Sequence, residues 1–166
     1  MEKHIASLKK AWFGGEAQDN LARLLAHLRA MLMSYQTSHW VARGDPQYGD
    51  HLLFQRLYEA LGGEIDSLAE KMVGYINDSS VNLVYQIQLI DGMVNSWSAI
   101  PCPFERGLVT ETQLQDLLKQ TLDSMDATGD TPLGFTDFLP ALASAHDTNM
   151  YLLQQRLKGH DVKKNI

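Results

Sequence analysis

Residues 20–44 read NLARLLAHLRAMLMSYQTSHWVARG, and leucine recurs through this stretch at steps of three and four residues. Side chains at those steps share one side of an α-helix, so the pattern predicts a helix with one buried face. Tyr35 and His39 continue the apolar stripe, and Asp19 stands where an N-cap is expected. The Gly-Asp-Pro turn signal at 44–46 ends the predicted helix.

Four further segments repeat this periodicity. They predict helices from about 47 to 76, 81 to 97, 110 to 125 and 135 to 157. Thr110 and Gln113 match a capping box at the start of the third long helix. Pro140 is expected near the first turn of the last helix, where proline is tolerated. No segment carries a β-hairpin signal.

Four long amphipathic helices, with a shorter one between the second and third, predict an all-α fold arranged as a four-helix bundle. The length of 166 residues suits one domain with a single core. We expect that domain to occupy residues 1–166, with short tails at 1–18 and 159–166.

Charge and cysteine content exclude several classes of function. The chain has 14 basic and 20 acidic side chains, a net charge of -6, which argues against broad electrostatic binding of nucleic acid or anionic lipid and favours cations. Cys102 is the single cysteine, so neither an intrachain disulfide nor a cysteine-based zinc site can form. No apolar run is long enough for a secretion signal or a membrane helix, and we expect a cytoplasmic protein.

Five side chains suggest a metal site. His39 lies on the first predicted helix, whereas His51, Gln55, Asp66 and Glu70 share one flank of the second. His51 with Gln55, and Asp66 with Glu70, are each four residues apart, which lets two side chains reach one ion. Histidine and carboxylate ligands together suit iron, manganese or zinc better than calcium.

A single chain cannot bring these two pairs to one ion, because fifteen residues of helix span roughly 22 Å. Two copies of the second helix that cross antiparallel about a two-fold axis would pair the His51 end of one copy with the Asp66 and Glu70 end of the other, twice. The axis would pass near residues 60 and 61, next to Gly62 and Gly63, each of which costs about 1 kcal/mol in a helix interior relative to alanine. Close approach of a partner helix would explain both glycines.

The order His39-Trp40, Gly44, His51 and then EIDSLAEK at 64–71 resembles the Dps mini-ferritin family. The chain is similar to that family's last helix at three further places, 136–139, 146–147 and 152–153. The resemblance covers roughly residues 20 to 158.

This resemblance implies a ferritin-like bundle that assembles into a hollow dodecamer, with a ferroxidase site between two-fold-related subunits. It implies that ferrous iron is oxidised there, preferentially by hydrogen peroxide, and stored as ferric mineral, which protects against oxidative damage. Position by position, His39, His51, Asp66 and Glu70 match the family's iron ligands. Trp40 matches the aromatic residue beside that site.

Gln55 departs from the family pattern, which has aspartate four residues after the second histidine. A neutral amide oxygen is a weaker iron ligand than a carboxylate; Glu59, one turn further on, has a poorer angular position to compensate. Three interpretations therefore stay open. The chain is an active ferroxidase, a divergent shell that binds iron or zinc without fast oxidation, or a four-helix scaffold without metal.

The same residues have structural interpretations. His146 lacks a ligand pattern, so we expect it to be a core residue bonded to a backbone or tyrosine group. Trp40 by default packs in a core. Asp66 and Glu70, taken alone, fit a solvated helix face.

Two other regions carry charge. The resemblance offers Asp126 and Asp130 as lining of an iron-entry pore at a three-fold axis, although a solvated acidic turn explains them equally well. Basic tails in some family members bind DNA, and lysines stand near both ends of this chain, at 3, 9, 10, 158, 163 and 164. The net negative charge argues against DNA binding.

Overall fold

The computed structural model describes residues 15–43, 47–129 and 131–164, which form five α-helices and a short 3-10 helix but no strand. In chain order the elements are α2 (Gly15–Val41), α3 (Gln47–Tyr75), η1 (Asp78–Val81), α4 (Leu83–Ser98), α5 (Pro103–Asp126) and α6 (Leu133–Lys164). The predicted all-α class is confirmed. Among these helices, none combines the length and the apolar character needed to cross a membrane.

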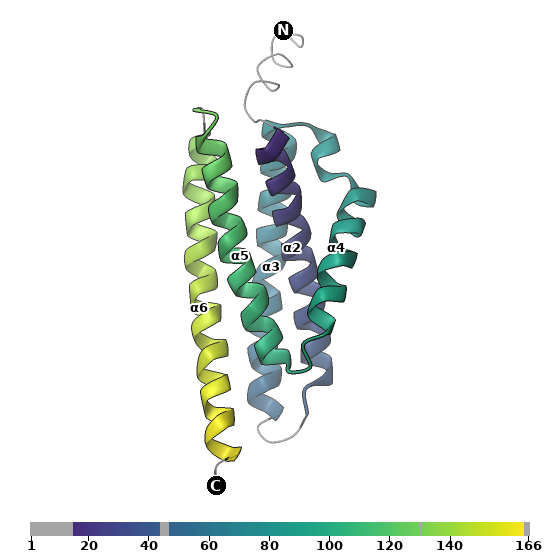
Figure 1. The fold of residues 1–166 in the computed structure, drawn as a ribbon, viewed down its shortest axis with the longest axis vertical. Helices are drawn as coiled ribbons and strands as arrows, with labels where there is room; N and C mark the ends of the chain where they lie inside the picture. Colours follow the sequence, from purple (N-terminus) through teal and green to yellow (C-terminus); the bar gives the residue numbers. More distant parts are fainter. Residues whose placement is uncertain (1–14, 44–46, 130, 165–166) are drawn as a thin grey trace.

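Consecutive helices run in alternating directions along the long axis of the molecule (Figure 1). α2 packs against α3, α4 and α5, and α5 packs against α6. The shorter α4 lies at the opposite side of the molecule from α6 and leads the chain from η1 to the start of α5 (Figure 1). The ends of α2 and α6 and the start of α3 therefore lie at the same end of the molecule.

The core is built mainly from the leucine stripe of α2 and the matching stripe of α3. The fully buried large side chains on these two helices are Leu21, Leu24, Leu25, Leu28, Met31, Tyr35, Phe54, Leu57, Leu61, Leu68 and Met72. Burial of each such apolar side chain stabilises the fold by roughly 1.5–3 kcal/mol before entropy is subtracted. The periodicity identified these two helices correctly because each helix buries a single face along most of its length.

The predicted ends of the first and last helices are wrong. α2 begins at Gly15, four residues before Asp19, so Asp19 is not its N-cap. An added turn places Ala17 on the buried face, 1% exposed. α6 extends to Lys164, since the Gly159 that follows its last apolar positions weakens a helix by only about 1 kcal/mol. The tails predicted at 1–18 and 159–166 therefore both overlap helices.

The predicted start of the third long helix is also wrong, because α5 begins at Pro103. Proline fits the first helical turn, where its missing N–H would have no helical partner. Thr110 lies inside the helix, and its Oγ1 donates to the backbone oxygen of Gly107 at 2.8 Å. The Gln113 side chain accepts from Trp97 Nε1 at 2.8 Å and serves helix packing, not capping.

Pro140 lies inside α6 and not near its first turn, because the helix starts at Leu133. Proline in a helix interior removes one backbone hydrogen bond. Phe135, Leu139 and Leu142 are buried on either side of it and hold both parts of the helix against the core.

Candidate metal centre

His39, in the last turn of α2, and His51, in the second turn of α3, contact each other directly. Their ring centroids are 3.6 Å apart and the ring planes differ by 25°, so the two imidazoles stack. Nδ1 of His39 lies 2.9 Å from the backbone oxygen of His51, and Nδ1 of His51 lies 3.0 Å from the backbone oxygen of His39. The two predicted histidine ligands are thus joined by a reciprocal pair of hydrogen bonds.

These hydrogen bonds determine which ring nitrogen carries hydrogen. A carbonyl oxygen can only accept, so Nδ1 of each neutral ring is the donor and Nε2 keeps its lone pair. Metal-binding histidines are usually held in this way, with one ring N–H on a carbonyl and the other nitrogen on the ion. The arrangement leaves Nε2 of both His39 and His51 available as a ligand.

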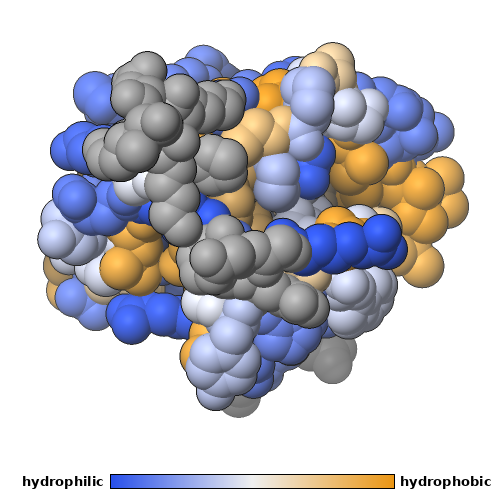
Figure 2. Space-filling model, turned by 90° about the horizontal axis from the view of Figure 1, so that it is seen from below, coloured by the Kyte–Doolittle hydropathy of each residue, from blue (hydrophilic) through white to orange (hydrophobic). Residues whose placement is uncertain are grey.

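Two aromatic residues adjoin this pair. Tyr58 contacts His39 in the fold, and Trp40 follows His39 in the sequence. The ring of Tyr58 meets the ring of His39 edge-on, with centroids 5.3 Å apart and planes at 77°. Trp40 is 71% exposed, so its default assignment to the core is wrong in the single chain. Figure 2 views the end of the molecule at which α2 ends and α3 begins, and apolar surface appears there between polar side chains.

An ion pair anchors the start of α3 beside the histidines. Asp50, the residue before His51, accepts hydrogen bonds from Nε and Nη2 of Arg156 on α6, the second at 2.9 Å. The Arg156 guanidinium also lies over the Phe104 ring, 4.8 Å from its centroid. Asp50 is buried and Arg156 half-buried, so the pair restrains the turn of α3 that carries His51.

Gln55 lies one turn beyond His51, and its amide is oriented by the next turn of the same helix. Its Nε2 donates to Oε1 of Glu59 at 2.6 Å. Because Glu59 accepts this bond, the amide nitrogen faces Glu59 and the amide oxygen faces elsewhere. Gln55 can therefore offer only oxygen to an ion.

Asp66 and Glu70 are exposed near the other end of α3 and form no hydrogen bond or ion pair within the described residues. The structure does not bring them to the histidine pair, since fifteen residues of α3 separate His51 from Asp66. Accordingly, no group of three or more histidine, cysteine, aspartate or glutamate side chains that could hold an ion occurs in residues 15–43, 47–129 and 131–164. Within one chain, the histidine pair and the Asp66 and Glu70 pair are therefore separate.

A buried polar network, which the sequence did not predict, connects all four long helices. Tyr35 of α2 donates to Oε1 of Glu111 on α5 at 2.8 Å, and Nδ1 of His146 on α6 lies 2.6 Å from Oε2 of the same carboxylate. The other ring nitrogen of His146 lies 3.1 Å from Oε2 of Glu64 on α3. The expected backbone or tyrosine partner of His146 is wrong, because two carboxylates hold its ring.

These contacts control the charge of His146. Burial lowers the pKa of His146, but its hydrogen bonds to Glu111 and Glu64 and the charges of both carboxylates outweigh burial and raise the pKa to about 9. The ring is an imidazolium at neutral pH, with both nitrogens donating. A protonated His146 ring has no lone pair for a metal. The network of Tyr35, Glu64, Glu111 and His146 is therefore a structural ion cluster.

The signal that could have identified the network is a carboxylate on an apolar stripe. Glu64 stands between Leu61 and Leu68 on the buried side of α3, and Glu111 precedes Leu114 at a three-residue step on α5. Charged residues at such positions are almost never fully buried unless they are paired. His146 is the cationic partner for both.

His27 of α2 is a second buried histidine, with the opposite shift. Its Nε2 lies 2.9 Å from the backbone oxygen of Thr110, and the Trp97 ring meets it edge-on at 5.0 Å. Burial lowers the pKa of His27 to about 4; the bond to Thr110 opposes this effect and the charge of His146 adds to it. His27 is neutral in the core.

Half of the predicted pore and tail residues lie outside the described residues. Asp126 is exposed at the end of α5 and accepts from Thr131 Oγ1 at 2.6 Å, whereas Asp130 lies outside the described residues. The same is true of the turn at 44–46 and of the lysines at 3, 9 and 10. The acidic pore and the absence of DNA binding stay predictions.

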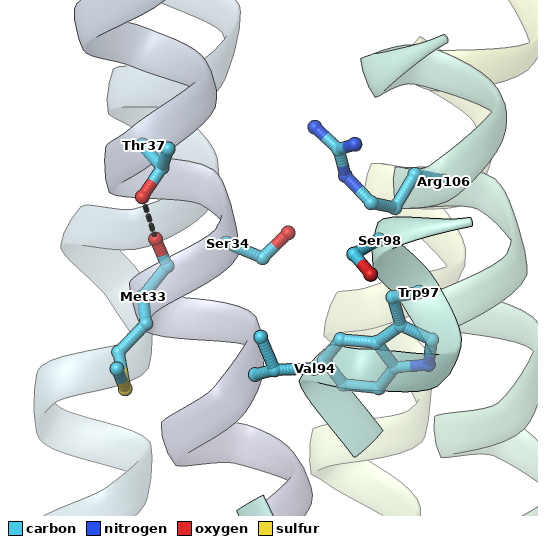
Figure 3. Close-up of a pocket in the computed structure, with 7 residues that line it drawn as sticks. All are labelled: Met33, Ser34, Thr37, Val94, Trp97, Ser98 and Arg106. Atoms are coloured by element: carbon cyan, nitrogen blue, oxygen red, sulfur yellow. Dashed lines mark hydrogen bonds between the residues drawn. The ribbon is translucent and has the colours of Figure 1, made fainter. Parts of the chain in front are cut away.

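A cavity of about 240 Å³ lies between α2, α4 and the start of α5, and none of the predicted ligands lines it (Figure 3). Met33, Val94 and Trp97 supply apolar walls. Arg106, the charged side chain among the described residues that line the cavity, donates to the backbone oxygen of Ile100 at 3.0 Å and to Ser38 Oγ at 3.3 Å. Its guanidinium thus links the start of α5 to the α4–α5 connection and to α2.

Comparison with known proteins leaves the family open. No sequence model of a protein family matches the chain, and no curated protein sequence is significantly similar to it.

Proposed function

We propose that this chain is a Dps-like ferritin: a ferritin-like four-helix bundle that oxidises ferrous iron with hydrogen peroxide and stores the ferric product in a dodecameric shell. The site would combine His39, His51 and the Gln55 oxygen of one subunit with Asp66 and Glu70 of another. The observation that carries the proposal is the histidine pair, whose reciprocal hydrogen bonds leave both Nε2 atoms free.

The donor set suits ferrous iron as substrate. Imidazole nitrogens with carboxylate oxygens are ligands that first-row divalent metals prefer, and exposed Asp66 and Glu70 have no cationic partner among the described residues to compete with an ion. Gly62 and Gly63 also support the two-chain arrangement. A Cβ added at either one would meet nothing in its own chain, so intrachain packing does not require glycine there.

Oxidation of ferrous iron by hydrogen peroxide requires ligands for the iron and a supply of protons. It does not require a dedicated catalytic acid. Hydrogen peroxide takes two electrons and two protons to become two water molecules, and each ferrous ion supplies one electron. Imidazole and carboxylate ligands lower the energy of the ferric product because they offset its added charge. The net charge of -6 favours delivery of the cation to the shell.

The test is an anaerobic ferrous titration of the apo-protein, followed by hydrogen peroxide, with ferric absorbance recorded. We expect rapid oxidation in the unmodified protein and loss of it in Asp66→Ala, Glu70→Ala. A matched control, Asp19→Ala, Asp116→Ala, removes two exposed carboxylates from other helices and should behave as the unmodified protein. Particle mass from light scattering reports the shell independently.

The alternative is a shell or metal-binding particle without fast ferroxidase activity, and the neutral side chain of Gln55 favours it. In that case ferrous or zinc ions bind near one per subunit, the Asp66 and Glu70 variant loses them, and peroxide oxidises iron no faster than in the variant. Absence of metal binding in the unmodified protein would reject both candidates and leave the scaffold interpretation.

A further inference from the structure

Among the described residues, Glu59 is the acidic side chain that hydrogen-bonds to the histidine-side half of the proposed centre, formed by His39, His51 and Gln55. His51, Gln55 and Glu59 follow one another at four-residue steps along one flank of α3, and Gln55 Nε2 donates to Glu59 Oε1 at 2.6 Å. Resting on the proposed function, we propose that Glu59 is a positioning residue. It turns the Gln55 oxygen toward the metal and supplies, through the amide, the negative charge that Gln55 itself lacks.

The direction of the hydrogen bond carries the first part of this proposal. In the absence of a metal, an unrestrained glutamine side chain can turn either its amide nitrogen or its amide oxygen toward the metal position, and only the oxygen can bind a cation. A carboxylate acceptor holds the NH2 group, so the oxygen lone pairs are left for the ion. Glu59 therefore removes one of the two amide orientations before a metal arrives.

The charge of Glu59 carries the second part. A hydrogen bond to an ionised acceptor is roughly twice as strong as a neutral one, and it draws electron density through the amide onto its oxygen. Carboxylates that accept from metal-bound histidines raise the basicity of the ligand in the same way. The glutamine oxygen thereby becomes a better ligand than an isolated amide.

The surroundings of Glu59 favour this role over a surface ion pair. Arg56 lies three residues earlier, a spacing that permits an ion pair on a helix, yet within the described residues Glu59 bonds to Gln55 and forms no ion pair with Arg56. In the two-fold crossing described above, Gln55 faces Asp66 of a second copy, and Glu59 faces Gly62. A glycine there leaves room for the carboxylate beside the axis.

The test measures Co(II) binding to the full-length protein by calorimetry and visible absorption, without any turnover. Glu59→Gln removes the charge and keeps an acceptor; we expect it to weaken Co(II) binding about tenfold. In the Gln55→Leu background the same substitution should change affinity less than about twofold, because Glu59 acts through the amide. Glu105→Gln, an exposed glutamate on α5, is the control and should have no effect.

Two results would overturn the inference while leaving the proposed function intact: Glu59→Gln binds Co(II) as the unmodified protein does, or it loses the same affinity with and without Gln55. The second result would mean that Glu59 acts on the ion directly. If the unmodified protein does not bind Co(II), or if Asp66→Ala, Glu70→Ala binds it equally well, the proposed centre itself is wrong and Glu59 has no such role.

Discussion

Nδ1 of His146 lies 2.6 Å from Oε2 of Glu111, and both side chains are buried in the middle of the bundle. Glu64 accepts from the other nitrogen of the ring, so one histidine joins α3, α5 and α6. This ion cluster lies outside the candidate metal centre. It makes the stability of the fold depend on pH in a direction that can be worked out.

Stability should fall on the alkaline side because His146 loses its proton there. Its folded pKa is about 9 and its usual value is 6.5, so its contribution is complete below pH 6.5 and disappears as the pH rises through 9. A loss on the order of 3 kcal/mol is expected. Urea unfolding between pH 6.5 and 9.5 measures it, and His146→Gln should remove most of the slope; equal slopes would contradict the assignment.

His27 should produce the opposite dependence on the acid side. Its folded pKa is about 4, below the usual 6.5, so the unfolded chain takes up a proton first and stability is lost as the pH falls from 6.5 to 4. Surface carboxylates titrate in part of the same range. The comparison is therefore between the unmodified protein and His27→Gln, whose unfolding free energy should depend less steeply on pH from 6.5 to 5.

The anchor between α3 and α6 should be worth a large part of the total stability. Arg156→Met leaves the buried Asp50 carboxylate without its cation, and we expect a loss of ~2–3 kcal/mol, below the range for fully buried pairs because some solvent reaches both side chains. Urea denaturation measures this loss. Asp50→Asn added to Arg156→Met should restore part of it, and no recovery would mean that stacking of Arg156 on Phe104 dominates.

Gly62→Leu should impair self-association and leave the fold of the single chain intact. A Cβ at Gly62 meets nothing within its own chain, so a loss of self-association with an intact fold would point to contact with another copy. Sedimentation velocity reports the assembly and circular dichroism reports the fold. Gly159→Leu is the same change at another helical glycine with open space around it. Assembly that is equal in both variants would argue against the crossing at Gly62.

The candidate centre could be predicted only in part. The spacing predicted His39 and His51 as ligands from different helices, and the structure places the two rings in contact. The spacing could not reveal which ring nitrogen is free. That depends on backbone carbonyls across the α2–α3 connection. The sequence analysis did not predict the hydrogen bond between Gln55 and Glu59. Ideal helical angles fix the direction of each Cα–Cβ bond, but they do not fix the side-chain torsions that bring the two polar groups together.

Periodicity by itself determined the all-α class and the bounds of α3, because a helix that buries one face along its whole length repeats its apolar residues at 3.6-residue intervals. Tertiary structure alone decided the partners of the buried polar groups. Glu64, Glu111 and His146 are separated by 35 residues or more, and they meet only when three helices pack together. A local sequence pattern cannot predict such distant contacts. The energy of a buried charged side chain depends on the charges that lie beside it in space and not on the residues next to it in the sequence.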